Sequence, residues 1–218
     1  MAAGSAKSQH DNLTVIDHPL VQHKLALLRD ESTGSGDFRR LCREITLLAA
    51  YEALADLAVE PTEVKTPIQG TTANRLRSPA PAVVGILRAG LVMVDAVLEL
   101  LPQSPVGHLG MYRDPESHEA VDYYAKLPDR IDEREVLLVD PMLATGGSAV
   151  NAISILKEAG AHDIRLLCII AAPEGVEAVH RSHPEVRITV AGLDEGLNDR
   201  AYIVPGLGDA GDRIYGTR

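Results

Sequence analysis

Residues 136–150 read V-L-L-V-D-P-M-L-A-T-G-G-S-A-V, and this stretch decides the fold of the chain. Its first four apolar residues predict a buried strand, and Asp140 follows where that strand ends. Small residues at 144–147 predict a tight turn, and an apolar-periodic helix begins near Ser148. The N–H groups of such a turn, together with the positive end of the helix, bind a phosphate monoester. We therefore predict a phosphate-binding loop, to which the hydroxyls of Thr145 and Ser148 add donors.

Two other phosphate-binding motifs are absent from this stretch. It has no lysine of the G-x-x-x-x-G-K-[ST] type, which argues against a nucleoside triphosphatase, and no G-x-G-x-x-G, which argues against a dinucleotide fold. The remaining alternative is an ordinary strand, turn and helix with a Gly-Gly turn. That alternative requires the acid, the threonine, the glycines and the serine to coincide by chance. Asp140 is an acceptor that suits a pair of sugar hydroxyls.

Composition and charge limit the class of protein. The chain has 218 residues, 45% of them hydrophobic, which is enough for one full core. Its formal net charge of -10 argues against a nucleic-acid or anionic-membrane surface, because such surfaces are basic. A polyanionic ligand must therefore be bound by locally placed arginines.

The location of the protein is predicted from its termini and its thiols. Residues 1–12 are small and polar and predict a disordered tail, with neither a signal peptide nor an apolar run of membrane length. Cys42 and Cys168 lie in apolar contexts without metal-ligand spacing, so we interpret both as core thiols and predict no metal bound by protein side chains alone. These features predict a cytoplasmic protein.

The order of elements predicts an α/β fold with an open, mostly parallel sheet and helices on both faces. Strands are expected at 82–87, 136–139, 164–170 and 186–190, and helices between them at 91–101, 148–159 and 175–181. Residues 13–218 then form one domain. Two further helices come first, one at 19–29 with Pro19 at its start and a longer one capped by Asp37 with a stripe from Phe38 to Leu57.

Two segments depart from this alternation. Residues 13–65 are expected to form a helical arm, and polar residues 66–81 to hold short edge strands. Residues 110–127 contain two strand-like runs around a polar turn, which predicts a hairpin that stands away from the sheet and closes over substrate as a lid.

Ligands of open parallel sheets bind beyond the carboxyl ends of the strands, and three such ends carry suggestive residues. Arg88-Ala89-Gly90 follows the strand at 82–87 and suits an anion such as pyrophosphate. Asp140 follows the second strand. Near the C-terminus, 205–212 reads P-G-L-G-D-A-G-D, where glycines allow close approach of a flat ligand and Asp209 or Asp212 could hold a magnesium-bound diphosphate.

These segments together resemble the uracil phosphoribosyltransferase family, a branch of the type I phosphoribosyltransferases. The resemblance rests on G-I-L-R-A-G at 85–90, G-M-Y-R at 110–113, the stretch 140–148, and Y-I-V-P-G-L-G-D-A-G-D at 202–212, and it extends from His18 to Thr217. The wider family usually has two adjacent acids at the ribose. Pro141 stands at the second of these positions, as in the uracil branch.

The resemblance implies roles for individual residues. It implies transfer of ribose 5-phosphate from phosphoribosyl pyrophosphate (PRPP) to N1 of uracil, giving UMP and pyrophosphate, with Mg²⁺ bound mainly through the diphosphate. Catalytic roles fall on Arg88, Arg113, Asp140 and Asp209. PRPP is expected to contact these four and Pro141, Met142, Leu143, Ala144, Thr145, Gly146, Gly147 and Ser148, and uracil to contact Ile203, Gly208, Asp209 and Ala210. No residue is identified as a general base for the N1 proton.

The resemblance also implies partners, and two other functions remain open. It implies a homodimer or higher homo-oligomer and a GTP effector, and no residue locates the effector site. One alternative is a phosphoribosyltransferase for another base, which the segment 202–212 disfavours. The other is a regulator that kept the fold and binds RNA or DNA, which should show a basic face.

Overall fold

The computed structural model describes residues 12–113 and 120–217, and of residues 112–113 and 120–123 it describes the backbone alone. The predicted tail at 1–12 thus lies almost wholly outside the described residues. None of the described helices is long and apolar enough to cross a membrane.

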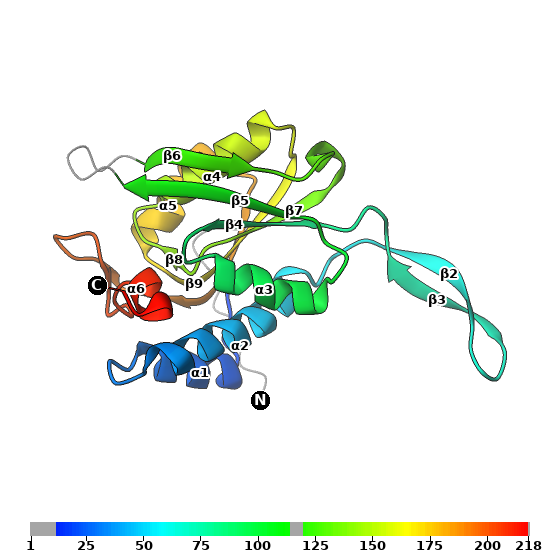
Figure 1. The fold of residues 1–218 in the computed structure, drawn as a ribbon, viewed down its shortest axis with the longest axis horizontal. Helices are drawn as coiled ribbons and strands as arrows, with labels where there is room; N and C mark the ends of the chain where they lie inside the picture. The colour runs from blue at the N-terminus through cyan, green and yellow to red at the C-terminus, as the bar shows by residue number, and fades with distance from the viewer. Residues whose placement is uncertain (1–11, 114–119, 218) are drawn as a thin grey trace.

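A central sheet organises the chain (Figure 1). In the described residues it has eight strands in the order β1-β10-β9-β7-β4-β5-β6, with β8 beside β9. All of these pairs are parallel except β5 with β6. The bounds are Leu13–Val15 for β1, Ala82–Leu87 for β4, Val106–Arg113 for β5, Ala120–Lys126 for β6, Glu135–Val139 for β7, Met142–Leu143 for β8, Asp163–Ala171 for β9 and Arg187–Leu193 for β10. The open, mostly parallel sheet is as predicted.

Helices cover both faces of the sheet, because its central strands are apolar on both sides. Leu137 and Leu167 belong to one buried cluster, whereas their neighbours Leu138 and Leu166 belong to the other. The first cluster includes residues of α1 (Pro19–Arg29), α2 (Ser35–Ala53), α3 (Leu91–Leu100) and α6 (Ala210–Tyr215). The second includes residues of α4 (Gly147–Glu158) and α5 (Pro173–Ser182). The strands and helices expected from residue 82 onward are confirmed, with ends that differ by at most three residues.

The N-terminal third differs from the predicted helical arm. Residues 13–65 begin with β1, which pairs with β10, and end in β2 (Val59–Lys65), so they are not helical throughout. Pro19 does begin α1. Helix α2 is capped by Gly34 rather than Asp37, which lies in its first turn, and it ends before Leu57. Its apolar side packs on α3 and the sheet, so these helices are part of the core.

The hairpin predicted at 110–127 is in part continuous with the main sheet. From Val106 to Gly110, β5 pairs with β4, and residues 124–126 of β6 form the edge of the main sheet. From Met111 to Arg113, β5 pairs with β6 and no longer with β4, so this hairpin extends past the end of β4. Its turn, 114–119, lies outside the described residues. The hairpin that stands away from the sheet is formed by β2 and β3 (Gly70–Leu76), which pair with each other in a separate two-stranded sheet (Figure 1).

The remaining elements are short. Ile131–Glu133 forms a 3-10 helix before β7, and β11 (Gly196–Leu197) pairs with β12 (Ile203–Val204) between β10 and α6. Cys42 and Cys168 are both buried and free, which confirms the prediction of core thiols.

Candidate active site

The predicted phosphate loop joins β7 to α4. The chain leaves β7 at Val139, forms the short β8, which was not predicted, and enters α4 at Gly147. Gly146 is the N-cap of α4 with φ of 85°, and a Cβ there would lie 2.7 Å from the Cβ of Ala178. Only glycine fits this turn without strain. Because Gly146 has no side chain to cap the helix, the first N–H groups of α4 are left for another acceptor, such as a phosphate.

Asp140 lies between the end of β7 and this loop. Its backbone N–H donates to the Leu167 carbonyl at 3.2 Å, and its Oδ1 accepts a long hydrogen bond of 3.4 Å from the N–H of Met142. Burial raises the pKa of the carboxyl to about 7, because this one bond compensates little of the lost hydration. A ligand that brings hydroxyl donors or positive charge would stabilise the carboxylate.

Five segments of the chain meet at one cavity of about 220 Å³, and four of them contribute polar residues. Arg88 comes from the end of β4, Asp140 from the end of β7, Ser148 from α4 and Asp209 from the turn before α6. The full lining is Ile86, Leu87, Arg88, Ala89, Met111, Asp140, Ser148, Asp209 and Gly211. A smaller hollow of about 60 Å³, lined by Asp140 and residues 142–149, shares Asp140 and Ser148 with it. The phosphate loop and the predicted pyrophosphate side therefore adjoin.

Arg88 is held beside the cavity by the C-terminal helix. The Tyr215 hydroxyl donates to the backbone carbonyl of Arg88 at 2.9 Å, and the guanidinium lies 5.8 Å from the centroid of the Tyr215 ring. Its Nη2 is 3.8 Å from Oδ1 of Asp212, and 59% of the side chain is exposed. The cation is thus positioned but still available to an anion. The role of Tyr215 was missed, because it depends on a contact across 127 positions of sequence.

The C-terminal segment is placed beside the cavity. Asp209 caps α6 by accepting from the Asp212 N–H at 2.9 Å, and it also lines the cavity. Gly208 is exposed with φ of 82°, whereas the side chains of Ile203 and Ala210 are buried. Of the four residues predicted for uracil, the cavity therefore includes Asp209 alone; Ile203 lies in β12, Gly208 in the turn that follows, and Ala210 at the start of α6.

Other predicted residues fall into two groups. Residues 142–148 of the predicted loop all line the smaller hollow, and Pro141 precedes them with its carbonyl accepting from the Ile169 and Ile170 N–H groups at 3.1 Å. Arg113 ends β5, but its side chain is outside the described part of the chain. Sequence reasoning missed three residues that line the larger cavity, namely Ile86, Leu87 and Met111. Each belongs to the carboxyl end of a strand, which was the available signal.

No group of three or more His, Cys, Asp or Glu residues within the described residues could hold a metal ion. Asp140 and Asp209 are the carboxylates that line the cavity. A divalent cation at this cavity would therefore take most of its ligands from a bound substrate and water.

Comparison with known proteins gives one consistent result. The model of the uracil phosphoribosyltransferase family matches residues 15–217. Uracil phosphoribosyltransferase of Thermoanaerobacter sp. (strain X514) is 57% identical over 209 residues, which are 96% of this chain and 100% of that protein. The enzyme of the same name from Staphylococcus epidermidis (strain ATCC 35984) is 57% identical over 204 residues, covering 94% of this chain and 98% of that one.

Two solved structures extend the comparison to the fold. The AQ2163 protein from Aquifex aeolicus is 38% identical, superposes with a TM-score of 0.89, and covers 93% of this chain and 97% of its own. An adenine phosphoribosyltransferase from Trypanosoma brucei is similar in fold, with a TM-score of 0.59 at 14% identity, and covers 94% of this chain and 92% of its own.

Proposed function

The chain belongs to the uracil phosphoribosyltransferase family, and from that premise we propose how its residues transfer ribose 5-phosphate from PRPP to N1 of uracil, giving UMP and pyrophosphate. The observation that carries the proposal is the meeting of Arg88, Asp140, Ser148 and Asp209 at one cavity, next to the phosphate loop. These are the groups that a phosphorylated sugar with a diphosphate leaving group requires.

The sugar phosphate is bound by the loop between β7 and α4. We propose that the 5-phosphate accepts hydrogen bonds from the free N–H groups at the start of α4 and from the hydroxyls of Thr145 and Ser148. The ribose hydroxyls then face Asp140. Because the pKa of its carboxyl is raised by burial, binding of the sugar favours the ionised form by supplying donors.

The diphosphate leaves on the side of Arg88. An oxocarbenium-like transition state develops positive charge on the sugar ring, which the Asp140 carboxylate stabilises, while the departing oxygens gain negative charge that Arg88 and Arg113 stabilise. Catalysis then consists mainly of positioning and electrostatics. Magnesium, when bound, neutralises diphosphate charge; Asp209 would hold it directly or through water, and no protein cage is needed.

Uracil is bound by residues 203–210, which extend from β12 to the start of α6 and are called the uracil turn below. It presents an acceptor, a donor and an acceptor along O2, N3 and O4, and we assign its recognition to backbone groups of Ile203, Gly208 and Ala210. Cytosine would place its N4 donor against a donor and be rejected. The N1 proton passes to a leaving-group oxygen or to water.

A turnover assay with PRPP, Mg²⁺ and one base at a time tests this assignment. We expect UMP from uracil, and no nucleotide from orotate or hypoxanthine and far less from cytosine. Conversion of another base at a rate equal to that of uracil would contradict the base assignment. Retention on heparin without any conversion would instead favour the nucleic-acid-binding regulator.

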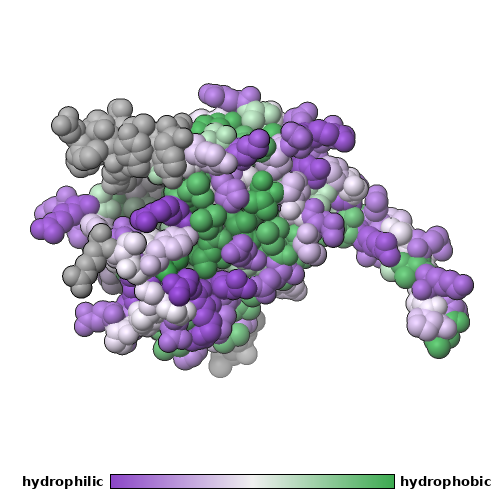
Figure 2. All heavy atoms as spheres, viewed as in Figure 1, coloured by the Kyte–Doolittle hydropathy of each residue, from purple (hydrophilic) through white to green (hydrophobic). Residues whose placement is uncertain are grey.

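We also propose that the protein is a homodimer or higher homo-oligomer. An isolated two-stranded hairpin is marginally stable in water, yet β2 and β3 extend away from the domain with Ile68 90% exposed at their turn. Figure 2 shows a continuous apolar area in the region of α3, where Leu91 and Leu100 are exposed. A second copy that covers this area and receives the hairpin would bury both. Light scattering should give at least twice the mass of 23.4 kDa.

Two remaining proposals concern regulation and location. The family resemblance suggests GTP activation, which is tested by measuring the initial rate at low PRPP with and without GTP.

A cytoplasmic location is supported by two buried thiols that form no disulfide. Cell fractionation tests it.

A further inference from the structure

Two residues that do not line the cavity bind both backbone polar groups of Gly206 in the uracil turn. Arg29 lies at the C-terminal end of α1, and Asp194 follows β10. The N–H of Gly206 donates to Asp194 Oδ2 at 2.9 Å, and the carbonyl of Gly206 accepts from Arg29 Nη1 at 2.7 Å. Arg29 also forms a two-point ion pair with Asp194, in which Nη1 is 2.8 Å from Oδ2 and Nη2 contacts Oδ1.

The Arg29–Asp194 pair is shielded from water. The side chain of Asp194 is 3% exposed and that of Arg29 is 23% exposed. A buried ion pair loses much of its Coulomb attraction to desolvation, so it contributes little to stability unless it also satisfies specific hydrogen bonds. Here the hydrogen bonds beyond the ion pair go to Gly206, which indicates that the pair orients this residue.

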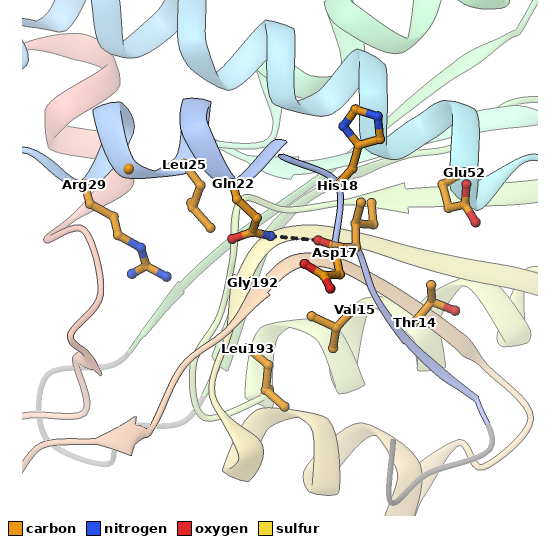
Figure 3. Close-up of a pocket in the computed structure, with 12 residues that line it drawn as sticks. Thr14, Val15, Asp17, His18, Gln22, Leu25, Arg29, Glu52, Gly192 and Leu193 are labelled. Carbon is orange, nitrogen blue, oxygen red and sulfur yellow. Dashed lines mark hydrogen bonds between the residues drawn. The ribbon is translucent and has the colours of Figure 1, made fainter. Parts of the chain in front are cut away.

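The pair is anchored to the sheet. Gln22 of α1 donates from Nε2 to the Ile16 carbonyl at 2.7 Å and to the Ala191 carbonyl at 2.9 Å. Figure 3 shows Gln22, Leu25 and Arg29 extending from α1 toward the end of β10, along a cavity of about 850 Å³. The N–H of Asp194 donates to the Ala171 carbonyl at the end of β9, at 2.8 Å. Arg29 and Asp194 thus transmit the position of the sheet to Gly206.

The conformation at Gly206 determines the geometry of the turn. Its φ is 65°, and a Cβ there would lie 2.1 Å from the Ile203 carbonyl oxygen. Ile203 precedes Gly206 and Gly208 follows it, so a change in the backbone angles of Gly206 would displace the backbone groups that we assign to uracil. Because recognition by backbone groups tolerates little displacement, the turn requires such support.

We propose that Arg29 and Asp194 are positioning residues for uracil recognition. They act through the backbone N–H and carbonyl of Gly206 rather than by contact with either substrate. The proposal rests on the assignment of uracil to this turn. It implies that loss of the pair weakens binding of uracil and spares binding of PRPP, whose phosphate loop is attached to β7 and α4.

The test compares Arg29→Met and Asp194→Asn with the wild type, measuring KM for uracil, KM for PRPP and kcat separately. We expect KM for uracil to rise on the order of 10-fold, as for a lost hydrogen bond to a charged group, with KM for PRPP changed by less than about 2-fold. Arg29→Lys, which keeps the charge, should be intermediate. The matched control is Lys24→Met, which removes an ion pair with Glu44 from the same helix but touches no residue of the turn.

Several results would overturn the proposal. These are an unchanged KM for uracil in both variants, equal increases in both KM values, or the same change in Lys24→Met. If Arg29→Met does not fold because it leaves Asp194 buried without a counter-charge, the double variant Arg29→Met with Asp194→Asn removes that charge and is assayed in its place. A wild type that does not use uracil would refute the proposed function instead, so the two failures are distinguishable.

Discussion

Replacing Asp140 with asparagine should make the free protein more stable and the enzyme slower. Burial raises the pKa of the Asp140 carboxyl from 3.8 to about 7 in the folded protein. Between these values the folded protein retains a proton that the unfolded chain has released. Stability contributed by this group is therefore complete below pH 3.8 and is lost as the pH rises toward 7. An asparagine is neutral throughout and avoids this loss.

The size of the effect follows from the pKa. A carboxyl whose pKa rises from 3.8 to about 7 destabilises the fold above pH 7 by about 4 kcal/mol relative to a neutral group. Because Asp140 is partly exposed to solvent, about 4 kcal/mol is the upper limit of this effect. Urea unfolding of the wild type and of Asp140→Asn at pH 5 and pH 8 measures this difference in the free energy of unfolding. The advantage of Asp140→Asn at pH 5 should be less than about half of that at pH 8.

The same variant should lose activity on the order of 10²-fold, because the amide lacks the charge that faces the ribose and its developing cation. In the wild type, kcat/KM for PRPP should rise as the free enzyme's Asp140 ionises near pH 7 and then level off, a step that the variant lacks. Wild-type turnover in the folded variant would refute the assigned role. An equal stability difference at pH 5 and pH 8 would refute the raised pKa.

Three further results are expected. Gly208→Val should impair use of uracil, because a β-branched residue at φ of 82° is strained by about 1–3 kcal/mol. Ile203→Val leaves the backbone in place, so its effect should be mild. A loss of affinity for PRPP alone in Gly208→Val would place the base elsewhere. Cys42 and Cys168 should resist alkylation in the folded protein and react after unfolding. Burial raises the pKa of the Cys42 thiol to about 12 and raises the pKa of the Cys168 thiol well above its usual value. Rapid labelling of the folded protein at pH 8 would contradict this prediction. Ile68→Asp should shift the mass in light scattering toward the monomer, and an unchanged mass would indicate an interface that excludes the hairpin turn.

The parts of the site that could be predicted from sequence are local. The loop at 140–148 places its acid, glycines and hydroxyls within nine positions, and a strand-turn-helix pattern surrounds them, so periodicity and turn chemistry suffice. Gly146 illustrates this point, because the Gly-Gly turn predicted from the sequence is where the backbone adopts a positive φ, which glycine does without strain. Arg88 was found in the same way, from its place after an apolar strand.

The hairpin of β2 and β3 was not predicted, for a physical reason. Periodicity reveals a strand through the contrast between a buried and an exposed face. In β2 and β3 nearly every residue is exposed, so residues 59–76 show no such contrast and their few apolar residues do not alternate regularly with polar ones. The first half of β5 contains Gly107 and His108, which weaken a strand pattern, and its identity comes from pairing with β4.

Residues that support a turn from a distance are the hardest to find, and Asp194 shows why. In the sequence it begins D-E-G-L-N, a polar run that indicates an ordinary surface turn. Its burial arises because β10 ends beside α1, which puts Arg29 within reach across 165 positions. That proximity is set by the order of strands in the sheet, not by any local pattern. A local motif thus identifies the groups that contact a ligand, whereas the residues that hold those groups in place become visible only when the topology is known.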